Sequence, residues 1–250
     1  MKREYLEVTS RIGCAVDCLK YCPQKLTESL YSGNKVLSIC DWQTILDHLP
    51  DDLPIFFSGF SEPFGNNHLI ELIDMAYKKG HPLGLFTTLF QASREDVEKL
   101  VKYPYLSFCL HLPDGNVMKI PISQEYKDNV FTVLQNVKNV STSIMNDLFV
   151  DNNRENMAKG IQSKTKHFRF CEKLDYPQFS LLPNGNVSIC CMDITASQII
   201  GNLLTENYAD IKQRFLASKK KFKLCSHCHY NVSPLRAVAR KAIARSRALT

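Results

Sequence analysis

The sequence predicts an α/β protein, with a partial barrel of five or six βα units followed by a small β-hairpin/α region. Through residues 4–150, apolar stretches of strand length alternate with stretches of helix length, which is typical of parallel βα units. A complete eight-unit barrel takes about 250 residues, so the ~160 residues before a second, cysteine-rich region suffice for five or six units. That second region carries Asn184-Gly185 between two alternating stretches, the strongest short signal for a β-hairpin.

The individual elements follow from periodicity and capping. The expected strands cover residues 4–9, 55–57, 83–90, 105–112 and, more weakly, 141–150, and the hairpin covers 178–191. The expected helices cover residues 34–49, 69–79, 93–101 and 124–137, where apolar residues recur at helical intervals. Active sites of barrels lie at the carboxyl ends of the strands, so the residues that follow each strand are the candidates for function.

Composition indicates a globular protein that works in the cytoplasm. The chain has 250 residues, of which 44% are hydrophobic and 22% charged, as in ordinary globular domains. No apolar run approaches the ~18 residues of a membrane span, and the amino terminus lacks the apolar stretch of a signal peptide. Ten cysteines in such a chain indicate metal or redox chemistry more than disulfides.

The net charge of +6 is concentrated at the carboxyl end, because residues 211–250 contain lysine and arginine but no acidic residue. Residues 233–250 are expected to form a basic tail, either a solvated helix or a disordered end. Binding of this tail to nucleic acid is a less favoured alternative.

Three cysteines, Cys14, Cys18 and Cys22, follow the first expected strand with the spacing C-x3-C-x3-C. Thiolates are the ligands that hold iron–sulfur clusters and zinc. A structural zinc or a closed cubane cluster takes four protein ligands, whereas three leave one metal position open for a substrate or cofactor. Free thiols in a loop are the alternative.

This loop resembles the signature loop of the radical S-adenosylmethionine (radical SAM) enzymes, with Tyr21 and Pro23 beside the last cysteine. The family's usual spacing is C-x3-C-x2-C, so the second gap here has one extra residue. The resemblance implies a [4Fe–4S] cluster on Cys14, Cys18 and Cys22, whose open iron chelates the amino and carboxylate groups of SAM. It also implies a radical SAM partial barrel, in agreement with the predicted fold.

A second motif, Ser58-Gly59-Phe60-Ser61-Glu62-Pro63, follows the second expected strand of the barrel. A glycine lets the backbone approach a ligand, and a carboxylate beside it can receive an ammonium group. The motif is similar to the family's G-G-E-P, which implies that Ser58, Gly59 and Glu62 bind the cofactor. The alternative is a strand-to-helix turn capped by the glutamate.

Three further candidates lie at or after later strands: Thr88, His111 and Arg154. The resemblance implies that residues like Thr88 contact the cofactor. His111 is a candidate proton acceptor, although a histidine in a strand is more often a core residue. Arg154 is a candidate partner for a carboxylate. His111 and Arg154 are the two candidate catalytic residues.

The second cysteine region contains Cys171, Cys190, Cys225 and Cys228. Four thiolates would close a cubane without an open corner. The pattern is similar to the SPASM and Twitch regions of radical SAM enzymes, which open with a cysteine, a spacer and G-x4-C, here Gly185 to Cys190. The resemblance implies one auxiliary [4Fe–4S] cluster; a zinc ribbon is the alternative. Cys191 competes with Cys190, and His227 or His229 competes for one of the later positions.

We therefore expect three segments: a radical SAM partial barrel over 1–165, an auxiliary-cluster domain over 166–232 and the tail. The resemblance implies an enzyme in which SAM is cleaved to a 5′-deoxyadenosyl radical that abstracts hydrogen from a peptide or sugar-type substrate. One auxiliary cluster suits an oxidation, and flavodoxin or ferredoxin would supply electrons. The alternatives are a zinc- or iron–sulfur-containing nucleic-acid-binding protein without catalysis and a relative that no longer cleaves SAM.

Overall fold

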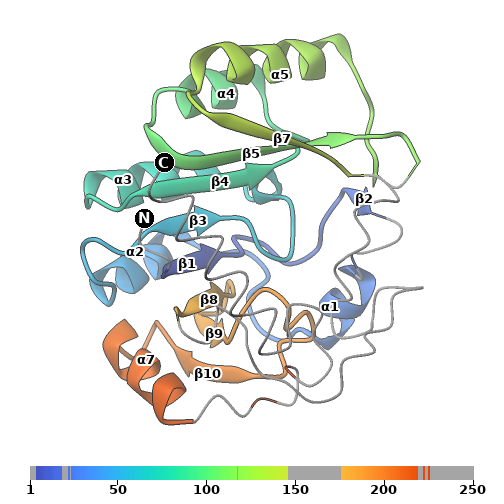
Figure 1. The fold of residues 1–250 in the computed structure, drawn as a ribbon. Helices are drawn as coiled ribbons and strands as arrows, with labels where there is room; N and C mark the ends of the chain where they lie inside the picture. The colour runs from blue at the N-terminus through green and yellow to red at the C-terminus, as the bar shows by residue number, and fades with distance from the viewer. Residues whose placement is uncertain are drawn as a thin grey trace, which may run out of the picture.

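The computed structural model describes residues 4–18, 22, 24–116, 118–145, 176–218, 222 and 225. Their main feature is an eight-stranded sheet with the order β10-β9-β8-β1-β3-β4-β5-β7 (Figure 1). The strands are β1 (Tyr5–Val8), β3 (Ile55–Phe57), β4 (Leu83–Thr87), β5 (Tyr105–Pro113), β7 (Val140–Met145), β8 (Gln178–Leu181), β9 (Asn186–Ser188) and β10 (Ile199–Asn202).

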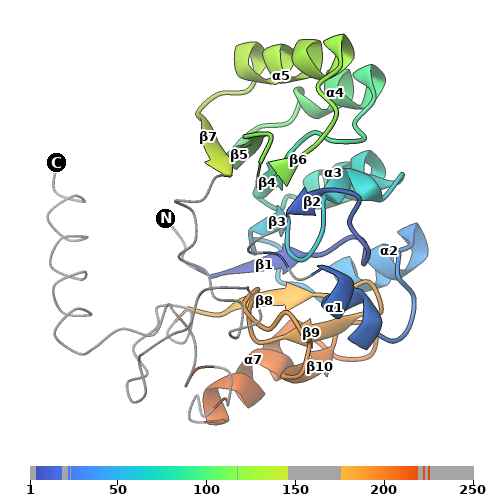
Figure 2. The same ribbon diagram turned by 90° about the vertical axis from the view of Figure 1, so that its right-hand side faces the viewer.

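A second, two-stranded sheet joins the cysteine loop to the segment after β5. It pairs β2 (Asp17–Cys18) with β6 (Met118–Lys119) in antiparallel fashion, and Cys18 lies opposite Met118. Figure 2 shows these two short strands side by side. Because β6 is followed by helix α5 (Gln124–Asn136), the start of that helix lies near the cysteine loop.

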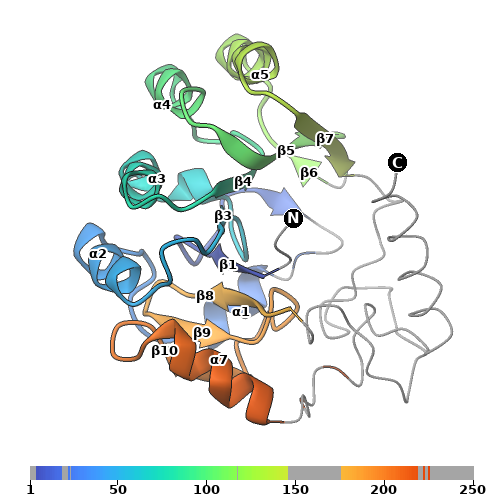
Figure 3. The same ribbon diagram turned by 60° about the vertical axis from the view of Figure 1, so that its left-hand side comes forward.

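The helices lie mainly between the parallel strands along the chain, and α7 follows the last strand. They are α1 (Gln24–Leu30), α2 (Ile39–Asp47), the 3-10 helix η1 (Pro63–Gly65), α3 (Leu69–Lys78), α4 (Arg94–Leu100), α5 and α7 (Tyr208–Ala217). Figure 3 shows α2, α3, α4 and α5 following one another along the curved sheet. Strands β1, β3, β4, β5 and β7 pair in parallel, which confirms the predicted partial barrel.

The carboxy-terminal hairpin continues this sheet. Strands β8 and β9 are antiparallel and turn through Gly185, whose φ of 81° is the left-handed conformation that glycine adopts readily. β8 also pairs in parallel with β1, from Tyr5 opposite Gln178 to Val8 opposite Leu181. The hairpin was predicted, whereas its pairing with β1 was not.

The core lies between the sheet and its helices. Trp42 of α2 is fully buried, contacts the ring of Phe57 edge-on and donates a hydrogen bond from Nε1 to the carbonyl of Leu72, at 2.9 Å. At the other end, α7 packs over the hairpin, because the ring of Phe215 contacts Phe179 at a centroid distance of 5.2 Å. The two ends thus share one continuous apolar core.

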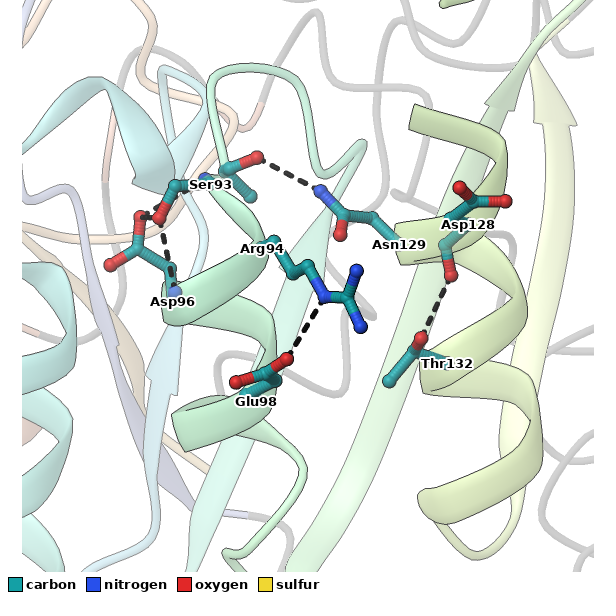
Figure 4. A network of polar contacts seen from close by, with 8 residues as sticks. Ser93, Arg94, Asp96, Glu98, Asp128, Asn129 and Thr132 are labelled. Atoms are coloured by element: carbon teal, nitrogen blue, oxygen red, sulfur yellow. Dashed lines mark hydrogen bonds and ion pairs between the residues drawn. The ribbon is translucent and has the colours of Figure 1, made fainter. Parts of the chain in front are cut away.

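Polar contacts within and between α4 and α5 are shown in Figure 4. Ser93 and Asp96 form a reciprocal capping box at the start of α4. Asn129 of α5 is buried, and its amide donates to the carbonyl of Ala92, at 3.0 Å. This bond ties α5 to the loop that precedes α4.

Some predicted boundaries are wrong for local reasons. The helix expected over 34–49 begins at Ile39, because Ser38 takes an extended conformation and caps the helix by accepting from the Asp41 amide. The strand expected over 83–90 ends at Thr87, since Leu89 and Gln91 have positive φ. Helices α1 and α7 and strand β10 were not predicted.

Several predictions fall outside the described residues: Arg154, Cys171, Cys228, residues 146–150 of the weak strand and the tail 233–250. In the part of the chain that the structure describes, no helix is both long and apolar enough to cross a membrane.

Candidate cofactor site

The candidate site is a pocket of about 170 Å³ at the carboxyl ends of the parallel strands. Its lining brings together nearly all the described residues that the sequence singled out in the barrel: Cys14, Cys18, Cys22, Ser58, Gly59, Glu62, Thr88 and His111. Glu7, Gln24 and Phe86 line the same pocket and were not predicted.

Two of the three cysteine sulfurs accept hydrogen bonds from the pocket wall. The Glu62 amide donates to Cys14 Sγ at 3.2 Å, and the Gln24 side chain donates to Cys22 Sγ at 2.9 Å. Burial raises the pKa of the Cys14 thiol to about 11, and a coordinated metal would deprotonate such a thiol. Hydrogen bonds to sulfur stabilise the thiolate form that a cluster requires.

Gly59 is required by its surroundings. Its φ is 91°, and a Cβ placed there would collide with Thr9 Oγ1. The same Thr9 hydroxyl accepts a hydrogen bond from the Phe60 amide at 3.2 Å. The Gly59 backbone therefore lies directly against Thr9, the residue that follows β1.

Glu62 is a buried carboxylate held by the end of β4. It accepts hydrogen bonds from the Thr88 amide at 2.8 Å, from the Thr88 hydroxyl at 2.7 Å and from the Thr87 hydroxyl. Burial raises its pKa, although these bonds oppose the shift. It also caps η1 by accepting from the Phe64 amide, so the capping alternative and the ligand interpretation are compatible.

Glu7 forms a second buried carboxylate in the pocket, on β1. Its two oxygens accept one hydroxyl each, from Ser58 at 2.6 Å and from Ser180 of β8 at 3.0 Å. The ion pairs formed among the described residues do not include Glu7. A single acidic residue in a strand has no spacing pattern, which is why the sequence did not indicate it.

His111 lies on β5, and its ring is 6.4 Å from that of Phe86, measured between centroids. Burial lowers its pKa, so the ring is neutral at neutral pH. A neutral imidazole in a pocket can accept a proton.

The second cysteine region is described in part. Cys190 and Cys225 both pack against the main core, whereas Cys191 packs against a separate group formed by Ile12, Phe60, Leu182 and Ile194. Asp193 is fully buried and organises this loop by accepting from the Ser188 hydroxyl at 2.6 Å and from the Gln198 amide at 2.8 Å.

The residues present fit an iron–sulfur cluster with SAM. Three thiols and a buried carboxylate face one pocket, and only a glycine fits at the close approach to β1. Within the described ranges, no group of three or more His, Cys, Asp or Glu side chains forms a site for a single metal ion. Three thiolates around a pocket suit a multi-iron cluster with one open position.

Comparisons with known proteins concern the carboxy-terminal region and the fold. Residues 171–229 match the SPASM family, an iron–sulfur cluster-binding domain. The fold resembles BtrN, crystallised with AdoMet (SAM) and 2-DOIA, with a TM-score of 0.72 and 17% identity over 91% of this chain and 94% of BtrN. No curated protein matches the sequence.

Two further structures share the fold. SuiB of Streptococcus suis, bound to the precursor peptide SuiA, gives a TM-score of 0.57 at 12% identity, over 90% of this chain and 69% of SuiB. Native anSMEcpe with bound AdoMet gives 0.56 at 13% identity, over 90% and 88%. The chain thus has the fold of these SAM-binding proteins. Its residues 171–229 carry the SPASM iron–sulfur cluster-binding pattern.

Proposed function

We propose that this chain is a radical SAM oxidoreductase that acts on a peptide or sugar-type substrate with the help of one auxiliary cluster. The observation that carries the proposal is the convergence of Cys14, Cys18, Cys22 and Glu62 on one pocket. A cluster bound by these thiolates would supply the electron that cleaves SAM to a 5′-deoxyadenosyl radical. The protein's own residues bind, orient and enclose the reactants.

The SAM end of the pocket is formed by Gly59, Glu62 and Thr88. The Glu62 carboxylate would receive the ammonium group of SAM by a charge-assisted hydrogen bond. Thr88 fixes the orientation of that carboxylate through its amide and hydroxyl. At Gly59 the backbone itself forms the pocket wall, because glycine has no side chain to lie between it and Thr9.

The substrate end would be formed by Glu7 and His111, which line the same pocket. The Glu7 carboxylate would bind a hydroxyl or ammonium group of the substrate, and the neutral His111 ring would accept the proton released in an oxidation. Arg154 remains a proposed partner for a substrate carboxylate. Among the proteins of similar fold, BtrN was crystallised with 2-DOIA and SuiB with a precursor peptide.

The auxiliary cluster would be held by Cys171, Cys190, Cys225 and Cys228. The common packing of Cys190 and Cys225 against the main core supports Cys190 over Cys191. A closed cluster near the substrate would accept the electron that remains after hydrogen abstraction. Flavodoxin or ferredoxin would reduce the first cluster.

The test is iron, sulfide and zinc content after anaerobic reconstitution, followed by assay of 5′-deoxyadenosine with SAM and dithionite. We expect about eight irons per chain and deoxyadenosine formation. The triple variant Cys14→Ala, Cys18→Ala, Cys22→Ala should lose about four irons and all cleavage, whereas Cys225→Ala with Cys228→Ala should lose about four irons and keep cleavage. Zinc without iron, and no cleavage, would refute the proposal.

A further inference from the structure

Tyr126, in the first turn of α5, has a hydroxyl group without a partner. Its oxygen is buried, and no hydrogen bond to it is formed within the described part of the chain. Buried polar groups are normally paired, because an unpaired one loses its bonds to water without replacement. No other side chain of the described residues has a buried nitrogen or oxygen in this condition.

The Tyr126 side chain packs next to the cofactor site. Tyr126 packs against a small apolar group of Val16, Met118 and Ile120, and the three thiols of the cysteine loop pack against the same group. The β2–β6 pairing explains this position, because it fixes the segment before α5 against the cysteine loop.

Burial of the ring, followed by the charge of Glu62, raises the pKa of Tyr126 to about 12. The hydroxyl therefore stays protonated at neutral pH and is available as a donor. Tyr126 thus packs against the same apolar group as the thiols, and the charge at the SAM end acts on its hydroxyl.

We propose that the Tyr126 hydroxyl donates a hydrogen bond to an anionic acceptor of the assembled site. The acceptor is either a sulfur atom of the iron–sulfur cluster or the carboxylate that SAM places on the open iron. The inference rests on the proposed function, since it requires the cluster.

The position of Tyr126 on its helix is well defined. Ser123 caps α5 and accepts from the Tyr126 amide at 3.1 Å. Asn129, one turn later, is bonded to the Ala92 carbonyl. A donor held by a rigid, capped helix loses little freedom when its acceptor arrives.

The first measurement is thermal unfolding of Tyr126→Phe with and without the cluster. In the cluster-free protein, Tyr126→Phe removes a buried hydroxyl that has no partner. Because such a group is destabilising, the Tm should rise by about 2 °C. With cluster and SAM bound, the gain should disappear or reverse. The control is Tyr105→Phe, whose hydroxyl donates to the Leu100 carbonyl at 3.2 Å, and which should lower the Tm in both states.

The second measurement identifies the acceptor. A hydrogen bond to sulfur favours the reduced, more negative cluster, so its loss in Tyr126→Phe should lower the midpoint potential of the cluster whose EPR signal SAM perturbs. A bond to the SAM carboxylate should instead appear as a roughly tenfold weaker Kd for SAM. Tyr105→Phe should leave both values unchanged.

The outcomes separate this inference from the proposed function. A wild-type chain that binds no iron would overturn both. A chain that loads its clusters and cleaves SAM, but whose Tyr126→Phe variant has an unchanged potential and SAM affinity, would overturn only the role of Tyr126. A lower Tm of the cluster-free variant would also overturn it, because it would mean that the hydroxyl already has a protein partner.

Discussion

Gly59 combines two constraints that act on a single residue: a left-handed backbone and a close contact with Thr9. Gly80 has nearly the same φ, 88° against 91°, but nothing lies within 4 Å of a Cβ placed there. The two glycines therefore separate backbone strain from steric collision.

We expect Gly59→Ala to destabilise the protein by about 1–3 kcal/mol more than Gly80→Ala. Both variants have the backbone strain, but only Gly59→Ala displaces the pocket wall from β1. SAM affinity should fall in Gly59→Ala alone, as measured by equilibrium dialysis beside urea unfolding. Equal effects of the two substitutions would contradict the close-contact argument.

Glu62 links stability to pH. Its pKa in the folded protein is raised above the ordinary value of 4.5, so the folded state holds its proton more tightly than the unfolded state does. Below pH 4.5 both states are protonated and the carboxyl imposes no penalty. As the pH rises above 4.5, ionisation of the buried group destabilises the cluster-free protein, and the penalty is complete above the raised folded pKa.

Glu62→Gln should remove this penalty. The variant without cluster should gain free energy of unfolding relative to the wild type as the pH rises from 4 to 7, as measured by urea titration at each pH. Its SAM affinity should fall roughly tenfold or more, because a charge-assisted bond is lost. Glu125→Gln, at an exposed position of α5, serves as the control with no such pH trend.

At the scale of single residues, the sequence predicted the pocket residues that belong to motifs and missed those that stand outside any motif. Cys14, Cys18, Cys22, Gly59 and Glu62 were found because spacing or a neighbouring strand marked them. Glu7 was not, because a lone acid in a strand looks the same whether it faces a pocket or the core. Only the packing of distant segments distinguishes these cases.

Among the elements, α5 is held in place by a hydrogen bond to a residue outside the helix. Among the residues of α5, Asn129 and Val133 are buried. The Asn129 amide is bonded outside the helix (Figure 4), whereas Thr132 only bonds the Asp128 carbonyl within it.

Asn129→Ala should therefore destabilise the protein by about 1–3 kcal/mol, because the Ala92 carbonyl loses its donor and a small void forms. Thr132→Ala, at a half-buried position of the same helix where the hydroxyl bonds only the Asp128 carbonyl, should change stability by less than about 0.5 kcal/mol. Chemical denaturation of the two variants gives the comparison. Similar losses of stability in both variants would show that the hydrogen bond from Asn129 to the Ala92 carbonyl is unimportant.

Local signals account for the elements that were predicted correctly. The Ser93 cap and the Asn184-Gly185 turn require only neighbouring residues, so the sequence shows them directly. The β1–β8 pairing joins residues far apart in the chain, and no local pattern encodes it. Helix α7 was missed for a related reason, since its apolar face is specified by the hairpin on which it packs.

At the level of the whole molecule, the barrel and the SPASM region are joined by hydrogen bonds at the first strand, β1. Ser180 of β8 donates to Glu7 of β1, while Tyr208 and Lys212 of α7 bond the two carboxylate oxygens of Glu4, at 2.9 and 2.8 Å. Removing the SPASM region would expose the edge of β1 and a face of the main core.

We expect a chain truncated to residues 1–165 not to fold on its own, although the sequence suggested a domain boundary there. It should be recovered mainly as aggregate and should show no cooperative thermal transition. A chain of residues 1–232, which lacks only the basic tail, should unfold cooperatively like the full chain. Cooperative unfolding of 1–165 would show that the barrel is independent.

The central place of β1 also has a consequence for synthesis of the protein in the cell. Glu7 and its hydrogen-bond partner Ser180 are 173 residues apart, so one side of the first strand has no partner until most of the chain has been translated. At typical elongation rates of ~5–20 residues per second, that interval is roughly 10–35 s. During this time the open edge can pair with other nascent chains, so the yield of soluble protein should depend on translation rate and on the chaperones that protect the edge.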